Sequence, residues 1–494
     1  MTYVFTFDAS ACSGCKACQE ACKDKNNLPV GVLWRRVVEV SGGEWENVGA
    51  RSPRPEINDA NGVGESDWVR RPDPYTVWTN TVFAYNLSIA CNHCEHPKCA
   101  GVCPTDAYVV RADGIVYIDE SKCMGCGYCA WACPYSAPRY HPERGQMSKC
   151  NFCFDNVDAG LPPSCVAACP LRALGFVEMD DGQLSTVHGP WSELWEIPAA
   201  EHPFPLPETS RTEPHLAVKP HAAMGNALEK KISNYEEIRP KHEKSETPLV
   251  IFTLLAQMAV GAFWALQWMS LGLTWEQRIL PLLSVGLCLA LAGWASFAHL
   301  GAKRNAWRVL AGLQKSWLSR EVLYVGLFGA GWIVSLLPLP KVDSALMGAA
   351  TSIVGAGLLY SMAQVYRLPS MPAWSTWRTP MGFFLTALLL GPLLAWIVLR
   401  SGGVSTPFAP MGWLVAALLV AQAALALSAR ETAPRRGDRL RFGLIGVGIL
   451  EAGLLAWEAG PPAAWMCIPL LLTVLLEEAL GRRRFYAALE ERRL

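Results

Sequence analysis

Long apolar stretches fill the second half of the chain, whereas the first half contains only short ones. From residue 248 onward, eight runs follow one another, and most approach the roughly twenty residues that an α-helix needs to cross a membrane. They cover approximately residues 249–271, 279–300, 322–339, 345–366, 381–399, 411–427, 442–457 and 463–480. The pattern predicts a bundle of eight transmembrane helices, with seven as the main alternative because the shortest runs are marginal.

Alternating apolar and polar residues in the first half predict short β-strands. The strands are expected at residues 1–8, 34–40, 75–85 and 114–119. Residues 52–74 are crowded with Pro, Gly, Asn and Asp and are predicted to form a surface loop. Residues 181–247 have no clear period, so an extended arm over the first domain and a solvated linker stay equal alternatives. We therefore expect three parts, namely 1–180, 181–247 and 248–494.

Sixteen of the eighteen cysteines lie in the first part, in four groups of four. Three closely spaced cysteines can wrap one [4Fe-4S] cluster, while a fourth, a few residues further on, reaches a neighbouring cluster. The groups are Cys12, Cys15, Cys18 and Cys22; Cys91, Cys94, Cys99 and Cys103; Cys123, Cys126, Cys129 and Cys133; and Cys150, Cys153, Cys165 and Cys169. The spacing predicts four [4Fe-4S] clusters in two linked pairs.

Two other uses of these cysteines are disfavoured. Structural zinc sites need pairs of cysteines rather than trios followed by a fourth. A disulfide framework is typical of secreted proteins, and the first residues have no features of a secretory signal. The remaining Cys288 and Cys467 lie inside apolar runs and are expected to be small buried side chains.

The charge of the chain is balanced overall but uneven among its loops. With 43 basic and 43 acidic residues, no bias points to nucleic acid. Loops on the side of the cysteine-rich domain contain 17 Lys and Arg residues, against 3 in the opposite loops. Positively charged loops stay in the cytoplasm. We therefore expect a multi-pass protein of the inner membrane, with its cysteine-rich domain facing the cytoplasm.

His299 and Glu321 are ionisable residues at the ends of two apolar runs, on the side of the cysteine-rich domain. Ionisable groups are costly there and are therefore functional candidates. A quinone head group needs a hydrogen-bond partner and a proton carrier, and a histidine can serve as both. A histidine that merely caps a helix is the competing interpretation.

Three further acidic residues fall within the apolar runs. Glu451 could serve a proton path or bond to a neighbouring helix, while Glu477 and Glu478 are expected to pair with the arginines at 482–484. The runs contain no histidine pair suited to bis-His haem ligation, so no haem is expected.

In two pieces, the chain resembles subunits of one family. Residues 1–180 resemble the four-cluster electron-transfer subunit of dimethyl sulfoxide reductase and related molybdopterin enzymes, in cysteine spacing and in FAYNLSI at 83–89 and CPYSAP at 133–138. Residues 248–480 are similar to the haem-free, eight-helix anchor subunit, through PLVIFT at 248–253, HLG at 299–301 and WRTPMGFFLT at 377–386. The resemblance implies a natural fusion, in which an α+β dicluster-ferredoxin-like domain with four clusters joins an all-α bundle of eight helices.

The resemblance also implies which cysteines share a cluster. The expected cluster sets are Cys12, Cys15, Cys18 and Cys169; Cys22, Cys150, Cys153 and Cys165; Cys91, Cys94, Cys99 and Cys133; and Cys103, Cys123, Cys126 and Cys129. His299 and Glu321 match the anchor positions linked to quinol binding. The family's loop arginine does not align cleanly with this sequence, and we add the neighbouring Arg304 as a candidate for the quinone site.

We expect the chain to carry electrons between a separate molybdopterin catalytic subunit and membrane quinone. Because the charges place the clusters inside the cell, the chain resembles cytoplasm-facing sulfite dehydrogenases, which pass electrons from sulfite to quinone. One alternative is quinol-driven reduction of dimethyl sulfoxide or polysulfide. Others are an ion-translocating redox complex and a stand-alone ferredoxin fused to an inert anchor.

Overall fold

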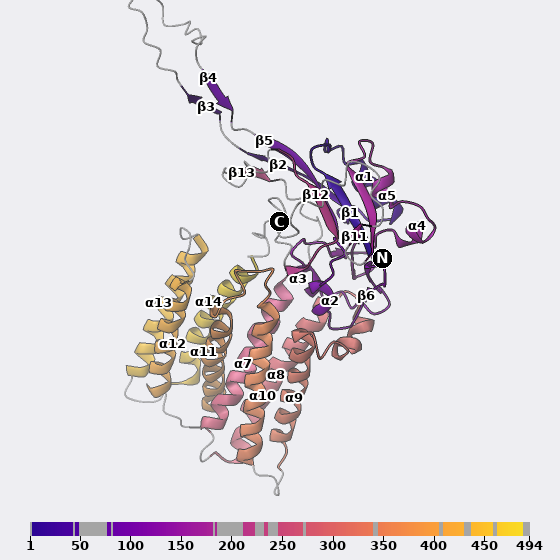
Figure 1. The fold of residues 1–494 in the computed structure, drawn as a ribbon. Helices are drawn as coiled ribbons and strands as arrows, with labels where there is room; N and C mark the ends of the chain where they lie inside the picture. Colours follow the sequence, from indigo (N-terminus) through magenta and orange to yellow (C-terminus); the bar gives the residue numbers. More distant parts are fainter. Residues whose placement is uncertain are drawn as a thin grey trace, which may run out of the picture.

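The computed structural model has two parts, a domain of short strands and helices that sits on one end of a bundle of long helices (Figure 1). The first part is the cysteine-rich domain, and the bundle begins at residue 247. The structure describes residues 2–42, 45–48, 77–80, 83–180, 183–184, 211–222, 232–235, 246–269, 273–338, 344–404, 409–428, 436–457 and 462–487.

The two ends of the cysteine-rich domain pair in one sheet. Strand β1 (Thr2–Asp8) runs antiparallel to β10 (Leu174–Asp180) and parallel to β12 (Leu216–Lys219). A short strand, β11 (Gln183–Leu184), extends the sheet beside β10. Because β1 leads into the first cysteine group and β10 follows the last one, the pairing brings the beginning and end of the domain together.

A second sheet and smaller hairpins complete the domain. The sheet has the order β13-β2-β5, formed by Ile232–Tyr235, Arg36–Gly42 and Phe83–Ile89. The antiparallel hairpins are β3 (Trp45–Val48) with β4 (Val77–Asn80), β6 (Tyr108–Val110) with β7 (Val116–Ile118), and β8 (Arg139–His141) with β9 (Gln146–Ser148). Strands β12 and β13 belong to the segment 181–247, so the described parts of that segment lie against the cysteine-rich domain.

The strands predicted at 1–8, 34–40 and 114–119 are confirmed by β1, β2 and β7. The single strand predicted at 75–85 is wrong, because β4 and β5 are separate strands with different partners. β-Forming residues continue through both strands, and their composition does not reveal which partner each one pairs with. The loop predicted at 52–74 lies outside the described residues.

Short helices lie within the cysteine groups. They are α1 (Ala17–Lys25), α2 (Lys98–Gly101), α3 (Tyr128–Ala132), α4 (Phe154–Asp158) and α5 (Ser164–Ala167). The residues directly before α1, α3 and α4 have a left-handed backbone, and at Gly127, before α3, the missing Cβ makes this conformation free of strain. Each reversal ends a loop of closely spaced cysteines and starts a helix.

The second half contains eight long described helices, one for each apolar run. They are α7 (Thr247–Met269), α8 (Trp275–His299), α9 (Trp317–Leu336), α10 (Ser344–Tyr366), α11 (Arg378–Ser401), α12 (Ala409–Ser428), α13 (Arg436–Trp457) and α14 (Ile468–Ala487). Pro248, Pro380 and Pro469 fall in first turns, where the missing N–H removes no helical hydrogen bond. Two 3-10 helices, η3 (Lys303–Leu310) and η4 (Ala464–Cys467), precede α9 and α14.

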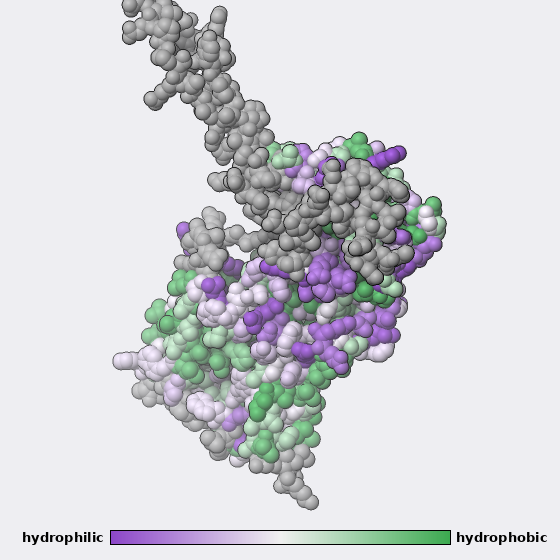
Figure 2. All heavy atoms as spheres, in the orientation of Figure 1, coloured by the Kyte–Doolittle hydropathy of each residue, from purple (hydrophilic) through white to green (hydrophobic). Residues whose placement is uncertain are grey.

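Among the described helices, seven are long and apolar enough to cross a membrane, all of the long ones except α9. The first turns of α9 contain Arg320 and Glu321, which lower its hydropathy. Figure 2 shows hydrophobic residues over the flank of the bundle and hydrophilic residues where it meets the cysteine-rich domain. On α8, Leu287 and Trp294 are exposed, as expected for side chains that face lipid. The chain is therefore a multi-pass membrane protein.

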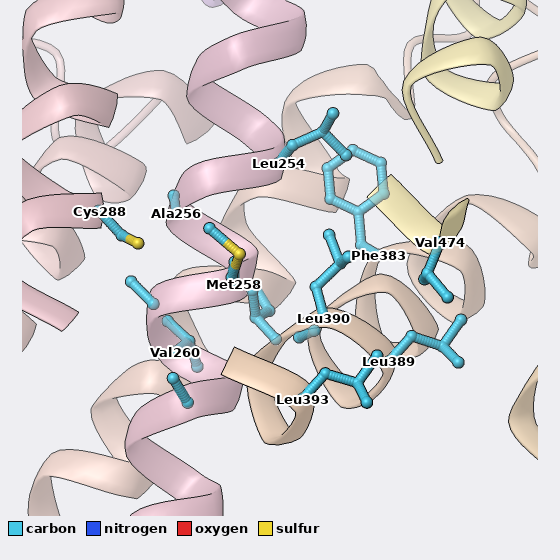
Figure 3. Close-up of a cluster of buried hydrophobic side chains, with 14 of the residues drawn as sticks. Leu254, Ala256, Met258, Val260, Cys288, Phe383, Leu389, Leu390, Leu393 and Val474 are labelled. Atoms are coloured by element: carbon cyan, nitrogen blue, oxygen red, sulfur yellow. The ribbon is translucent and has the colours of Figure 1, made fainter. Parts of the chain in front are cut away.

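The core of the bundle includes side chains of α7 and α11 that lie side by side (Figure 3). At their crossing, a Cβ added to Gly261 would lie 1.9 Å from the carbonyl oxygen of Ala387. Small residues of this kind let membrane helices approach closely. Cys288 and Cys467 are buried within the same core, which confirms the prediction that they are buried side chains.

Candidate metal centres and the junction with the membrane helices

The first set of neighbouring cysteines, set A, comprises Cys12, Cys15, Cys18 and Cys169. Burial raises the pKa of the Cys12 thiol, and the charges of Cys18, Cys169 and Cys15 raise it further. Together the four side chains line one pocket. The pairing of β1 with β10 explains why Cys169 joins cysteines from the beginning of the chain.

Set C comprises Cys91, Cys94, Cys99 and Cys133, which line a second pocket together with Lys149. Burial raises the pKa of Cys94 to about 12, with a contribution from Cys91 and Cys133. This pocket, like that of set A, is bordered by four thiols.

In sets B and D, too, neighbouring thiols raise one another's pKa. In set B, which comprises Cys22, Cys150, Cys153 and Cys165, burial and the charges of Cys165 and Cys153 raise the pKa of Cys22 to about 12. In set D, which comprises Cys103, Cys123, Cys126 and Cys129, burial first, and then the other three thiols, raise the pKa of Cys129.

The chemistry of these sets fits iron–sulfur clusters. Among the described residues, no three Cys, His, Asp or Glu side chains are close enough to hold a single metal ion. A zinc site needs four sulfurs at about 2.3 Å from one point, whereas the cysteines of a cubane bind separate iron atoms and stand further apart. Burial disfavours free thiolates here, so bound iron would supply the compensating positive charge. That each set binds one cluster stays a prediction.

The four sets follow one another in space in the order A, B, C, D. Cys18 of set A interacts electrostatically with Cys165 of set B, and Cys150 of set B interacts with Cys91 of set C. Tyr108 lies between sets C and D, where it interacts with Cys99 and Cys129. At the beginning of this file, Cys15 is exposed, and at its end, set D adjoins the membrane helices.

The connection between α8 and α9 holds the loops of set D. Asn305 of η3 donates a hydrogen bond to the carbonyl oxygen of Cys123 at 2.9 Å, and Ser316 donates to that of Val102 at 2.7 Å. The backbone N–H groups of Ala302 and Gly312 donate to carbonyls of the same loops. Set D is therefore supported by the bundle rather than by the cysteine-rich domain alone.

Three glycines make this close contact possible. A Cβ on Gly125 would lie 2.1 Å from the carbonyl oxygen of Gly145, and a Cβ on Gly301 would lie 1.9 Å from the same oxygen. Both distances are far below van der Waals contact. The backbone of the α8–α9 connection therefore packs directly against the set D loop region.

His299, the last residue of α8, is 8% exposed, and its Nε2 lies 3.3 Å from the carbonyl oxygen of Cys126. Glu321 of α9 is also buried, and its carboxylate interacts electrostatically with Tyr128. Burial, and then this carboxylate, raise the pKa of Tyr128. Arg304 is exposed on η3 and is not buried with them. His299 thus contacts the loop of set D at Cys126, and Glu321 interacts electrostatically with Tyr128, the first residue of α3, two residues further along the chain.

A second polar network, inside the bundle, surrounds Glu478 and Arg482, and the sequence reasoning did not name its other members. Arg482 of α14 donates hydrogen bonds to Gln257 of α7 and Thr386 of α11, and Glu478 accepts one from Thr386 at 2.8 Å and one from Gln422 of α12 at 3.0 Å. Polar residues inside the predicted spans were the available signal, since each must find a partner there.

The neighbouring acidic residues of the bundle have partners of their own. The direct partner of Glu477 is Arg441 of α13, at 2.6 Å, while Arg482 acts on Glu477 and Glu478 electrostatically. The Oε2 atom of Glu451 is buried without a hydrogen bond to any described residue. The prediction that the two glutamates pair with residues 482–484 therefore missed Arg441.

Aromatic residues link this network to set D. Tyr366 of α10 and Tyr486 of α14 share a hydrogen bond, and both rings pack against Trp131 of α3. Glu321 interacts electrostatically with both tyrosines. Polar and aromatic groups thus continue from the set D region into the bundle.

Two family models match the chain. A 4Fe-4S dicluster domain matches residues 82–179, and the DMSO reductase anchor subunit (DmsC) matches residues 242–432. The matched ranges include sets C and D, the junction and the bundle as far as α12.

Curated relatives match the first half. One chain of the anaerobic dimethyl sulfoxide reductase of Escherichia coli is 41% identical over 220 residues, which is 44% of this chain and 89% of that protein. A putative dimethyl sulfoxide reductase iron-sulfur subunit of Halobacterium salinarum is 35% identical over 196 residues, 36% of this chain and 67% of that protein. The thiosulfate reductase electron transfer subunit PhsB of Salmonella typhi is 35% identical over 183 residues, 37% and 79% of the two chains.

The two matches lie one after the other along a single polypeptide. The chain therefore belongs to the dimethyl sulfoxide reductase family, as a fusion of its iron–sulfur electron-transfer subunit with its membrane-anchor subunit.

Proposed function

We propose that each of the sets A to D binds one [4Fe-4S] cluster and that the chain relays electrons between a molybdopterin catalytic subunit and a membrane quinone. The observation that carries this proposal is that the four sets neighbour one another in the order A, B, C, D, from the exposed Cys15 to Cys126 beside His299. Bound clusters would supply one-electron transfer. The chain holds the sets in order and, beyond set A, buries most of their thiols away from water.

The quinone is bound at the junction, by His299 and Glu321. Reduction of a quinone to a quinol takes two electrons and two protons, and an imidazole and a carboxyl group can each deliver a proton. Their burial beside the set D loop supports this role, because a head group there would lie next to the end of the file. Arg304, exposed on η3, would add positive charge near the junction.

The cysteine-rich domain faces the cytoplasm in this proposal. Support comes from the 17 basic residues in loops on its side of the bundle, against 3 on the opposite side. A catalytic subunit would then dock near the exposed Cys15 on the cytoplasmic side. This arrangement suits sulfite oxidation coupled to quinone reduction.

Reverse electron flow is the second candidate, and the names of the relatives favour it. They are subunits of anaerobic dimethyl sulfoxide reductases and of a thiosulfate reductase, in which reducing equivalents end on a sulfur compound. In this direction, quinol would be oxidised at His299 and a sulfoxide or polysulfide reduced by the partner. The same residues serve both directions.

The test is to purify the full chain in detergent, count its iron, and follow the reduction of its clusters by electron paramagnetic resonance. We expect about sixteen iron atoms per chain, four for each cubane, and cluster reduction by a short-chain quinol or cluster oxidation by the matching quinone. Far fewer iron atoms would refute the four clusters. A full complement that exchanges no electrons with either carrier would refute the quinone site.

A further inference from the structure

Arg35 is a buried cation between sets A and B. Its side chain is 2% exposed, and Nη1 donates hydrogen bonds to the carbonyl oxygen and the Oγ of Ser88, at 3.4 and 3.2 Å. Burial lowers the pKa of the guanidinium, but the charges of set B thiols and of Cys18 outweigh this and raise the pKa overall. The cation therefore faces thiols of two sets at once.

Two nitrogens of Arg35 lack an acceptor among the described residues. Nε and Nη2 are buried and form no hydrogen bond within the described part of the chain. An unsatisfied buried N–H costs about 1–3 kcal/mol, and more when the group is charged. The guanidinium has Phe5 under its plane, 4.8 Å from the ring centre, so its free edge is the part left to interact with an acceptor.

Lys149 is the corresponding cation between sets B and C. It is 3% exposed, lines the pocket of set C, and donates hydrogen bonds to Sγ of Cys91 at 3.3 Å and to the carbonyl oxygens of Cys150 and Val116. An ammonium has three donors, so these bonds hold the charge at one position. Cys91 belongs to set C and Cys150 to set B.

A fixed positive charge stabilises whichever redox state of a neighbouring centre is more negative. Accepting an electron makes a cluster more negative, so an adjacent cation favours its reduced form and raises its reduction potential. The effect is large only when water does not screen it. Lys16 and Lys98 also stand beside cysteines of sets A and C, but they are exposed.

We propose that Arg35 and Lys149 set the reduction potentials of the first three clusters. Arg35 raises the potentials of the clusters at sets A and B, and Lys149 raises those of the clusters at sets B and C. They act through their positive charge alone, and neither is expected to change the reduction potential of the cluster at set D. This inference rests on the proposed function, because it requires the four clusters to be present. Its consequence is a file in which set B, next to both cations, is the most affected cluster.

The test is a redox titration of the purified full chain, monitored by electron paramagnetic resonance, for Arg35→Met and Lys149→Met. Each variant should lower two of the four cluster potentials by at least about 59 mV. For a one-electron centre, this equals a tenfold change in the ratio of reduced to oxidised cluster. One cluster should shift in both variants, and one in neither. Arg35→Lys, which keeps the charge, should shift much less than Arg35→Met.

Lys16→Gln and Lys98→Gln are the matched controls, since they remove one exposed charge beside the same sets and should leave the potentials nearly unchanged. Full iron content without the two-cluster pattern, or equal shifts in the controls, would overturn the inference. Iron loss in Arg35→Met and also in Arg35→Gln would show a structural role for Arg35 and overturn its tuning role. Fewer than four clusters in the wild-type chain would instead refute the proposed function.

Discussion

The imidazole of His299 lies against the backbone of Cys126, with Nε2 3.3 Å from the carbonyl oxygen. This contact joins the last residue of a membrane helix to a cysteine of set D. A quinone bound at His299 would therefore lie next to the loop that contains Cys126, and so next to set D, the last of the four sets.

We expect His299→Ala to lower quinone-linked turnover at least tenfold, because general acid–base groups contribute roughly 10²–10⁴-fold to proton transfer. Chemical reduction of the clusters by dithionite should be unchanged, since the carbonyl of Cys126 belongs to the backbone and stays in place. Steady-state assays with a soluble quinone, beside the iron content of the same sample, measure both. Undiminished turnover would remove His299 from the site.

The close contact at Gly301 gives a second prediction. Gly301→Ala places a methyl group 1.9 Å from the carbonyl oxygen of Gly145, so the α8–α9 connection must move away from the set D loops. We expect quinone-linked electron transfer to fall and the iron of set D to be lost, in contrast to the other sets. Gly293→Ala on α8 has no atom within 4 Å of the added Cβ and should behave like wild type.

Iron analysis and cluster spectra of these two variants decide the matter. Equal iron and equal turnover in Gly301→Ala and Gly293→Ala would show that the contact is not required. A loss from all four sets would point to general unfolding rather than to the junction.

The sequence was sufficient to predict the two-part fold because both of its signals are local. Cysteine spacing identifies the cluster loops, and hydrophobic length identifies the helices, so every apolar run became a described helix. Contacts across the fold were not accessible in this way. Nothing near Arg441 in sequence shows that it pairs with Glu477, and the contacts of Gly301 depend on how two domains meet.

The same limit explains the partial success with the junction residues. His299 and Glu321 could be selected because charge within an apolar run is unusual. Asn305 could not, since an asparagine in a polar connection is common, although it bonds directly to the backbone of set D. Arg35 stands directly before β2, next to a second arginine, and nothing local in the sequence shows that it is buried between sets A and B.

Removal of iron should unfold the cysteine-rich domain but not the bundle. In that domain the core includes many of the cysteines themselves, so bound clusters would provide much of its folding free energy. The bundle has its own continuous apolar core. After treatment with an iron chelator and an oxidant, limited proteolysis should degrade residues before 246 while leaving a fragment that contains α7–α14. Resistance of the cysteine-rich domain without iron would contradict this.

The hydrogen bonds of Glu478 should stabilise the bundle. Glu478→Leu removes the acceptor of the Gln422 amide inside the membrane and restricts the Thr386 hydroxyl to the carbonyl oxygen of Gly382, which costs about 1–2 kcal/mol. Glu451→Leu is the control, because one of its carboxylate oxygens already lacks a partner among the described residues. Unfolding in a denaturing detergent, followed by tryptophan fluorescence, should show a lower midpoint for Glu478→Leu alone. Equal midpoints would show that the network does not stabilise the bundle.

The proposed orientation predicts that Gly402 lies outside the cytoplasm. Gly402 directly follows α11, at the end of the helix opposite to Arg378, and a Cβ there meets no atom closer than 3.4 Å, so a cysteine fits without disturbing the fold. In intact cells, a membrane-impermeant maleimide should label Gly402→Cys. A cysteine replacing Trp307, which is 72% exposed on η3 beside the set D loops, should react only after the cells are opened. The reversed pattern would place the cysteine-rich domain outside the cell, and the catalytic partner and its sulfur substrate with it, because both must be on the side where Cys15 is exposed.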